Sequence, residues 1–131
     1  MKNRVHLDVH CTDVADLLAL GAEVVRRPRD GEAWWSLASR DGDELCAFVR
    51  TEPPDNRLYE IVVDAADAAP QAAWWADLLG GTATHETDGS SVGEVVGLTC
   101  DYLVFQLVPE PKTVKNRVHW DCCSPTSRSA T

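Results

Sequence analysis

The spacing of hydrophobic and polar side chains predicts the same order of strands and helix twice along this chain. Residues 4–10 alternate between apolar and polar positions, which predicts a half-buried strand. An apolar pattern of helical period follows, and Thr12 or Asp13 can cap its start while Gly21 can end it. Three more strands are predicted, at residues 23–27, 34–38 and 44–50. The first half of the chain is therefore predicted to be a strand, a helix and three strands.

The second half repeats this order after a linker at residues 51–56, whose two prolines suit neither a sheet ladder nor a helix interior. Asp67 can cap the helix of this half. Its strands are predicted at residues 59–65, 82–87, 93–98 and 102–108. We therefore expect one α+β domain over residues 1–121, made of two βαβββ modules at 1–53 and 57–111. Their strands should form a curved mixed sheet, a cup with the helices outside and the inner face free to hold a ligand.

A seven-residue segment occurs twice with a single difference. Residues 2–8 read KNRVHLD, and residues 115–121, within a duplicated segment at 114–121, read KNRVHWD. Two nearly identical strands would compete for one place beside the second module, and the displaced copy could pair with another chain. We expect a homodimer, with a strand swap as one way to form it; a second copy that hangs loose is the alternative. Residues 122–131 show no apolar periodicity and are predicted to be disordered.

The composition is that of a folded globular chain and narrows the choice of partners. The 131 residues suffice for one domain with a core, and no stretch approaches the roughly 20 apolar residues of a membrane helix. The N-terminus has no continuous apolar run, so no secretion signal is predicted and a cytoplasmic location is expected. A net charge of −9 disfavours nucleic acids and anionic membranes as partners. The five cysteines are odd in number and lack metal-knuckle spacing, which predicts free thiols.

Several stretches of the sequence together resemble a known family. They are residues 4–8, 18–22 and 35–48 in the first module, and residues 63–67, 75–80 and 105–119 in and after the second. The pattern is similar to the glyoxalase-like domain of the vicinal oxygen chelate superfamily, which includes glyoxalases, bleomycin-resistance proteins and extradiol dioxygenases. The resemblance runs through Asp121 and implies a fold of two βαβββ modules.

The order of the modules departs from the family pattern, in which the half with the Trp-Ala-x-Leu-Leu-Gly helix usually comes first. Here that half comes second, and the Lys-Asn-Arg-Val-His half begins again at Lys115 and breaks off after Asp121. We interpret the chain as a rearranged or truncated member of a longer tandem protein. A frameshift near residue 122 is one explanation.

The resemblance implies a candidate metal site in the cup. Metal-binding members place four ligands there, typically His and Glu, two from each module. His6 and Glu44 stand at the two positions of the first module, whereas Val62 and Tyr102 occupy those of the second and cannot complete the shell. His119 matches His6 in the repeat and could add a third ligand. Such a set suits a divalent Zn, Fe, Mn or Ni ion; the absence of any cofactor is the alternative.

Ligand-binding side chains are expected on the inward faces of the strands, at His6, Asp8, Trp34, Trp35, Tyr102 and Gln106. Trp34 and Trp35 are neighbours on one strand and point to opposite faces, so one of them should face the cup. Core packing is the alternative for both. Tyr102 and Gln106 share the inward parity of Glu44, which predicts a mostly apolar pocket with one polar anchor.

Three functions remain open on the sequence alone. The first is a non-catalytic binder of the bleomycin-resistance type that holds a small apolar or aromatic molecule in the cup. The second is an enzyme, a divalent-metal-dependent lyase, isomerase or dioxygenase, in which His6 and Glu44 hold a metal that acts as a Lewis acid on substrate oxygens. The third is a rearranged fragment with no activity of its own. The sequence shows no Ser-His-Asp, Cys-His or Gly-rich phosphate motif.

Overall fold

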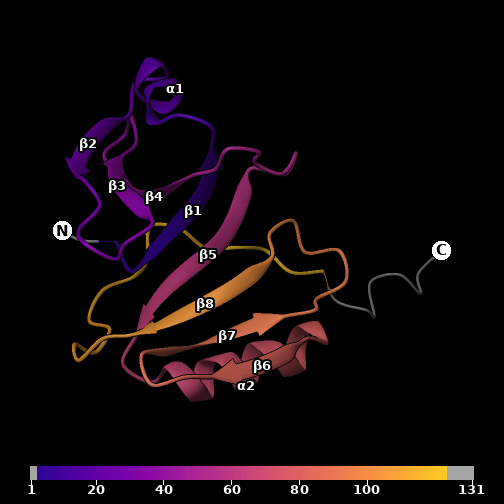
Figure 1. Ribbon diagram of the computed structural model, residues 1–131. Helices are drawn as coiled ribbons and strands as arrows, with labels where there is room; N and C mark the ends of the chain where they lie inside the picture. The colour runs from indigo at the N-terminus through magenta and orange to yellow at the C-terminus, as the bar shows by residue number, and fades with distance from the viewer. Residues whose placement is uncertain (1–2, 124–131) are drawn as a thin grey trace.

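The computed structural model describes residues 3–123 and contains the predicted order of elements twice (Figure 1). The first module consists of β1 (Val5–Cys11), α1 (Val14–Ala19), β2 (Glu23–Arg26), β3 (Trp34–Ala38) and β4 (Glu44–Val49). The second consists of β5 (Leu58–Ala65), α2 (Ala68–Leu79), β6 (Thr82–His85), β7 (Gly89–Gly93) and β8 (Tyr102–Leu107). Both modules are therefore βαβββ, as the periodicity predicted.

All eight strands belong to one sheet in the order β2-β3-β4-β1-β5-β8-β7-β6. The two modules meet at the centre, where β1 and β5 pair antiparallel with Val5 opposite Val63. Within each module the first strand pairs in parallel with the last, β1 with β4 and β5 with β8, and the outer pairs are antiparallel. The sheet is thus mixed, and the predicted α+β class is confirmed.

The helix α2 packs along the outer face of the second module, whereas the six-residue α1 covers only part of the first. On that face α2 packs over Val92, Leu103 and Phe105, which are almost fully buried. The short α1 closes a smaller core around Leu37 and Ala47. Because neighbouring residues of a strand point to opposite sides, the partners of these core residues line the inner face. Figure 1 shows the central strands β1, β5 and β8 running between the two helices.

Local signals in the sequence set the ends of the helices. The Asp13 carboxylate accepts a hydrogen bond from the backbone N–H of Ala15 at 2.9 Å, so it caps α1 as predicted. Asp67 stands at the cap position of α2, but its side chain makes no capping hydrogen bond. Gly80 ends α2 in the left-handed conformation, with φ 72°, which a residue without Cβ adopts at little cost.

The predicted strand at 93–98 is wrong, because β7 begins earlier, at Gly89. A Cβ on Gly89 would lie 2.5 Å from the carbonyl oxygen of Phe105, so the close pairing of β7 with β8 requires glycine there. After β7 the chain turns, with φ 57° at Glu94 and φ 83° at Gly97. The valine run that suggested a strand is partly solvent-exposed: Val96 is 99% exposed.

The second copy of the repeated segment does not form a strand. The first copy, as β1, holds the central place between β4 and β5, whereas residues 109–123 have no helix or strand. Arg117 pairs with Asp43 at 2.9 Å, and the ring of Trp120 packs 4.9 Å from that of Trp75. Of the tail predicted to be disordered, residues 124–131 lie outside the described residues.

The five cysteines are all free, as expected; three are buried, while Cys122 and Cys123 are exposed. Among the described residues no helix has the length and apolar character needed to cross a membrane.

Candidate functional site

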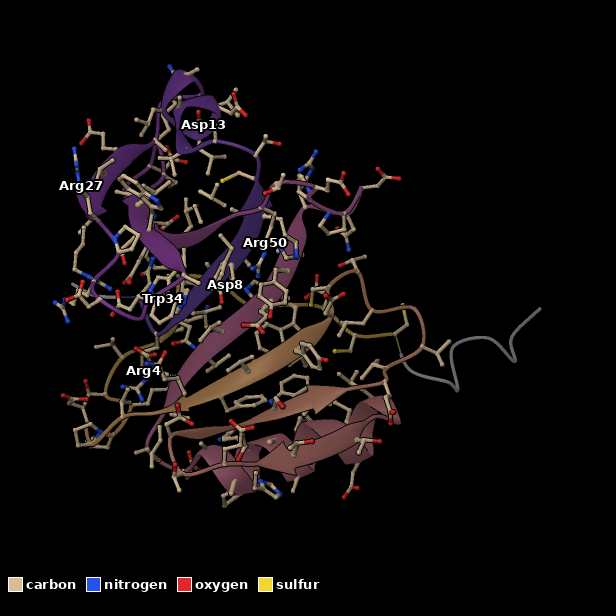
Figure 2. The ribbon with its side chains drawn as sticks, viewed as in Figure 1. Arg4, Asp8, Asp13, Arg27, Trp34 and Arg50 are labelled. Carbon is tan, nitrogen blue, oxygen red and sulfur yellow. The ribbon has the colours of Figure 1, made fainter. Side chains whose placement is uncertain are left out.

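The inner face of the sheet carries a cavity of about 830 Å³ that both modules line. Its walls come from β1, β3 and β4 on one side and from β5, β7 and β8 on the other. Side chains of the predicted set that line it are His6, Asp8, Trp34, Glu44, Tyr102 and Gln106. Figure 2 labels Asp8 on β1 and Trp34 on β3, both in the first module. The size is within the range of small-molecule pockets.

Strand register arranges the lining in rows that cross the sheet. One row runs Ser36, Cys46, Asp8, Glu60 and Tyr102, each opposite the next on a neighbouring strand. This acidic row crosses both modules and forms the middle of the inner face. It follows that residues far apart in sequence become neighbours only through the pairing of the strands.

The rows on either side differ in character. Toward one end, Trp34 is opposite Phe48, and Phe48 is opposite His10. Toward the other end, His6 is opposite Val62 and Val62 is opposite Val104. The acidic row is therefore flanked by an aromatic row and by the row that contains His6.

His6, Asp8 and Cys46 form a compact cluster at the bottom of the cavity. One nitrogen, oxygen or sulfur atom of each lies within 4.8 Å of the others. The Nε2 atom of His6 is 3.3 Å from Oδ1 of Asp8, and the two side chains are only 9% and 7% exposed. Within residues 3–123 the buried Nδ1 of His6 makes no hydrogen bond. Buried polar atoms normally find partners, so this cluster has capacity for a ligand.

The environment of His6 favours its charged form. Burial lowers the pKa of the ring, but hydrogen bonds and negative charge from Asp8 and Cys46 outweigh burial and raise that pKa to about 10. Across the acidic row, burial and the neighbouring Asp8 carboxylate raise the pKa of Glu60 to about 7. Ionisable side chains of β1, β4 and β5 thus interact with one another at the bottom of the cup.

The cluster fits a divalent metal by its donor atoms, although it is not the predicted set. Imidazole, carboxylate and thiolate are the donors of borderline ions such as Zn²⁺, and the buried Nδ1 of His6 has no hydrogen-bond partner within residues 3–123. Glu44 lines the cavity but is not in this cluster. His119 lies elsewhere, with its side chain 74% exposed and 3.6 Å from Asp121. The structure therefore places His6 and Glu44 in the same cavity and His119 outside it.

Cys46 is the site residue that the sequence analysis missed. It lies two residues after Glu44 and so has the same inward parity on β4. That parity is the signal for Cys46 in the sequence, whereas the family resemblance implies a carboxylate on this strand, which is Glu44. Phe48, two residues further, is likewise missed and lines the cavity.

The aromatic side of the cup contains Trp34 but not Trp35. The Trp34 and Phe48 rings lie 5.8 Å apart, and Tyr59 packs edge-on to Phe48 at 5.3 Å. Trp35 belongs instead to the outer core under α1, with the Arg27 guanidinium 5.7 Å from its ring. The expectation that Trp35 lines the pocket is corrected by strand alternation, which permits one of the two neighbours to face inward.

The charge of the lining differs from the mostly apolar pocket that was predicted. The basic residues that line the cavity are two arginines and His6. The carboxylates that line it are seven: Asp8, Glu32, Glu44, Glu60, Asp64, Glu86 and Asp88. One of the arginines, Arg26, already pairs with Glu32 at 2.6 Å. A polar inner wall carrying excess negative charge favours positive charge in a ligand.

Comparison with known proteins agrees with this architecture. The family model described as "Glyoxalase-like domain" matches residues 1–48 and 60–131. No curated protein sequence matches the chain.

Two solved structures illustrate the likeness of the fold. A methylmalonyl-CoA epimerase in complex with methylmalonyl-CoA and NH4+ superposes with a TM-score of 0.50 at 16% identity, over 86% of this chain and 100% of the other. A glyoxalase I variant from Zea mays superposes with a TM-score of 0.56 at 14% identity, over 80% of this chain and 45% of the other. This chain therefore spans about half the length of that glyoxalase I. At such identities the likeness concerns the fold alone.

Proposed function

This chain belongs to the glyoxalase-like domain family, and we propose that it binds a small molecule with an aromatic part and a positive charge in the cup between its modules. The observation that carries the proposal is the cavity of about 830 Å³ on the inner face, with an aromatic row beside an acidic row. Its volume lies in the range of pockets that enclose a small ligand.

The aromatic row supplies the contact for the planar part of the ligand. Trp34 and Phe48 lie on neighbouring strands with ring centroids 5.8 Å apart, and both line the cavity. Aromatic faces attract other rings and cations, and a desolvated cation over such a ring gains up to about 2 kcal/mol. A ligand that is aromatic therefore fits this end of the cup better than a flexible aliphatic one.

The acidic row supplies the contact for the positive charge. Asp8 and Glu60 stand opposite each other on β1 and β5, one row from Phe48 and Trp34. Residues two apart on a strand are separated by about 7 Å on the same face, which is the length of a small aromatic cation. The seven lining carboxylates disfavour an anionic ester such as the methylmalonyl-CoA held by the epimerase neighbour.

Tryptophan fluorescence with two matched probes tests this proposal. Benzamidine, an aromatic cation, should quench Trp34 and bind more tightly than benzoate, an aromatic anion of similar shape. Trp34→Leu should abolish the quenching, whereas Trp74→Leu should retain it, because Trp74 is 58% exposed on α2, outside the cavity. Equal binding of the two probes, or quenching that survives Trp34→Leu, would contradict the proposal.

A charge-removing pair of variants locates the cationic end. Above pH 7, where Glu60 is mostly ionised, Glu60→Gln should weaken benzamidine binding about ten-fold, a loss of about 1.4 kcal/mol. Glu44→Gln is the matched control, because Glu44 lines the same cavity but lies two rows from the aromatic row. Its effect should be several-fold smaller than that of Glu60→Gln.

A second candidate function is that of a metal-dependent enzyme, a lyase, isomerase or dioxygenase, and the His6–Asp8–Cys46 cluster favours it. These three residues would hold the ion, which when bound supplies Lewis acidity toward a substrate oxygen. The side chains around the cluster would orient that substrate and exclude water from it.

Metal analysis separates the two candidates. Incubation with Co²⁺ should give a thiolate-to-cobalt absorption band that disappears in Cys46→Ser and persists in Glu44→Gln. Near-stoichiometric metal in the purified protein would favour the enzyme. Absence of metal binding after incubation with Zn²⁺, Mn²⁺, Fe²⁺, Ni²⁺ and Co²⁺ would leave the binding function alone.

A further inference from the structure

The chain contains two copies of the segment that begins its central strand β1, and only one of them is in the sheet. Residues 2–8 and 115–121 agree at six of seven positions. The first copy continues as β1 between β4 and β5. We propose that residues 115–121 can replace β1 in the same chain and carry His119 and Asp121 into the cup in place of His6 and Asp8.

Such a replacement would keep the His and Asp side chains that β1 presents to the cup. In β1 the cup side carries His6 and Asp8, and the aligned residues of the second copy are His119 and Asp121. Even outside the sheet the second pair resembles the first, because the His–Asp separation is 3.6 Å in the second copy and 3.3 Å in the first. The His–Asp pair of β1 is thus encoded twice in the chain.

The single difference between the copies falls where the sheet can accept it. Trp120 would stand in place of Leu7, which points to the outer face and is 40% exposed in β1. A larger ring on that face meets solvent rather than the packed interior, so it causes no overpacking. A tryptophan in place of Val5, which is 3% exposed, would be different.

The second copy already lies close to the start of β1, the strand it would replace between β4 and β5. Arg117 and Asn3 both donate to the same carboxylate oxygen of Asp43, at 2.9 and 2.6 Å. Arg4, the first residue before β1, donates to the backbone carbonyl of Glu110 at 3.2 Å. Six residues separate Glu110 from Arg117, enough extended chain to turn back into the sheet. The family match also runs without interruption through 60–131, so it contains the second module and this segment together.

This short tether favours exchange within one chain over exchange between two. A linker of a few residues holds its segment at an effective concentration in the millimolar range, above that of a second copy in dilute solution. The expected strand-swapped homodimer is then the outcome that the test must separate from exchange within one chain.

The first copy, and not the second, occupies the place between β4 and β5 because its pairing with the neighbouring strands is longer. Beyond Asp8, β1 continues to Cys11 opposite Val49. His10 stacks on Tyr59 with ring centroids 4.5 Å apart, and its backbone N–H donates to the backbone carbonyl of Arg57 at 2.8 Å. The second copy offers Cys122 and Cys123 at these positions and loses the stacking. Exchange should therefore become dominant only when β1 is weakened.

Proline substitutions in the full chain test the proposal. Leu7→Pro removes a backbone donor from a strand that is paired on both sides, opposite Leu45 and Ile61, and would ordinarily unfold a small sheet. We expect Leu7→Pro to remain folded with a cooperative thermal transition, and Leu7→Pro with Val118→Pro to unfold. Ile61→Pro in β5, a central strand without a second copy, is the matched control and should unfold.

Thiol labelling reports which copy is in the sheet. Cys122 and Cys123 are exposed in the resting structure, and exchange would place them opposite Ala47 and Phe48. Their labelling in Leu7→Pro, followed by peptide mass spectrometry, should slow at least about ten-fold relative to the unsubstituted chain. Unfolding of Leu7→Pro to the same extent as Ile61→Pro, or a folded Leu7→Pro whose two thiols still react rapidly, overturns the proposal. A folded form that appears only as a concentration-dependent dimer overturns it too, in favour of exchange between copies.

One arm of the test rests on the proposed function. In Leu7→Pro, benzamidine binding should persist, and Asp121→Asn should weaken it as Asp8→Asn does in the unsubstituted chain. If the unsubstituted chain binds no benzamidine, the ligand proposal fails, while proline tolerance and thiol protection still decide the strand exchange. If Leu7→Pro binds benzamidine and the addition of Asp121→Asn leaves the affinity unchanged, Asp121 does not replace Asp8 and the exchange is overturned.

Discussion

The His6–Asp8 pair should make the stability of the metal-free protein depend on pH. Burial lowers the pKa of His6, but Asp8 and Cys46 raise it overall to about 10, against 6.5 for the unperturbed side chain. The folded protein therefore holds the proton more tightly than the unfolded chain. The resulting stabilisation is complete below pH 6.5 and is lost as the pH rises through about 10.

The magnitude follows from linkage between protonation and folding. One such proton changes the free energy of unfolding by about 1.4 kcal/mol per pH unit between the two pKa values. The window from 6.5 to about 10 sets an upper value of about 5 kcal/mol. The His6 side chain is only 9% exposed, so solvent screens little of this effect. Glu60 affects stability at lower pH. Its pKa is raised from 4.5 to about 7, so the stabilisation from its bound proton is lost as the pH rises between these two values.

Urea unfolding between pH 7 and pH 10, with a chelator present, measures the effect. The free energy of unfolding of the unsubstituted chain should fall relative to that of His6→Gln over this range, by up to about 1.4 kcal/mol per unit. His119→Gln is the matched control, because His119 follows the same four residues but is 74% exposed. The buried thiols Cys11 and Cys100 also have raised pKa values, but every variant retains them. Parallel curves for His6→Gln and the unsubstituted chain would refute the reasoning.

Three further predictions concern the fold that supports the cup. Phe105→Ala should destabilise by about 3–5 kcal/mol in urea unfolding, since the ring is 1% exposed under α2, whereas Val96→Ala at a 99% exposed position should change little. Gly89→Ala should lower the thermal midpoint, because its Cβ would lie 2.5 Å from a β8 carbonyl; an unchanged midpoint would show that β7 can shift. Asp13→Ala should cost about 1 kcal/mol by removing the α1 cap, and Thr12→Ala, which leaves the cap bond intact, should not.

An acidic inner wall also sets this cup apart from the apolar pocket that the strand pattern suggested. The apolar pocket was predicted from Tyr102 and Gln106 on β8, where the inward residues are indeed mostly uncharged. The carboxylates come mainly from other elements: Asp8 on β1, Glu60 and Asp64 on β5, and the loops around β2 and β7. A pocket inherits its charge from every strand that faces it, so one strand is a poor guide to the whole.

Local sequence determined the elements and the repeat of modules, because period, caps and breakers act over a few residues. The strands β1, β3, β4, β5 and β8, both helix starts and the glycine end of α2 follow from such signals. β7 was misplaced because a valine run imitates a strand, while the close contact that requires Gly89 comes from β8.

Only the tertiary structure decided which residues share the cup. The acidic row joins Cys46, Asp8 and Glu60 from three strands, and their proximity depends on strand order and register, which no local pattern contains. The same holds for the repeated segment. Its two copies have nearly the same intrinsic preference, and the sheet accommodates one. The first copy fills that place because the residues that follow Asp8, through Cys11, pair with β4, whereas the residues that follow Asp121 differ from them in sequence.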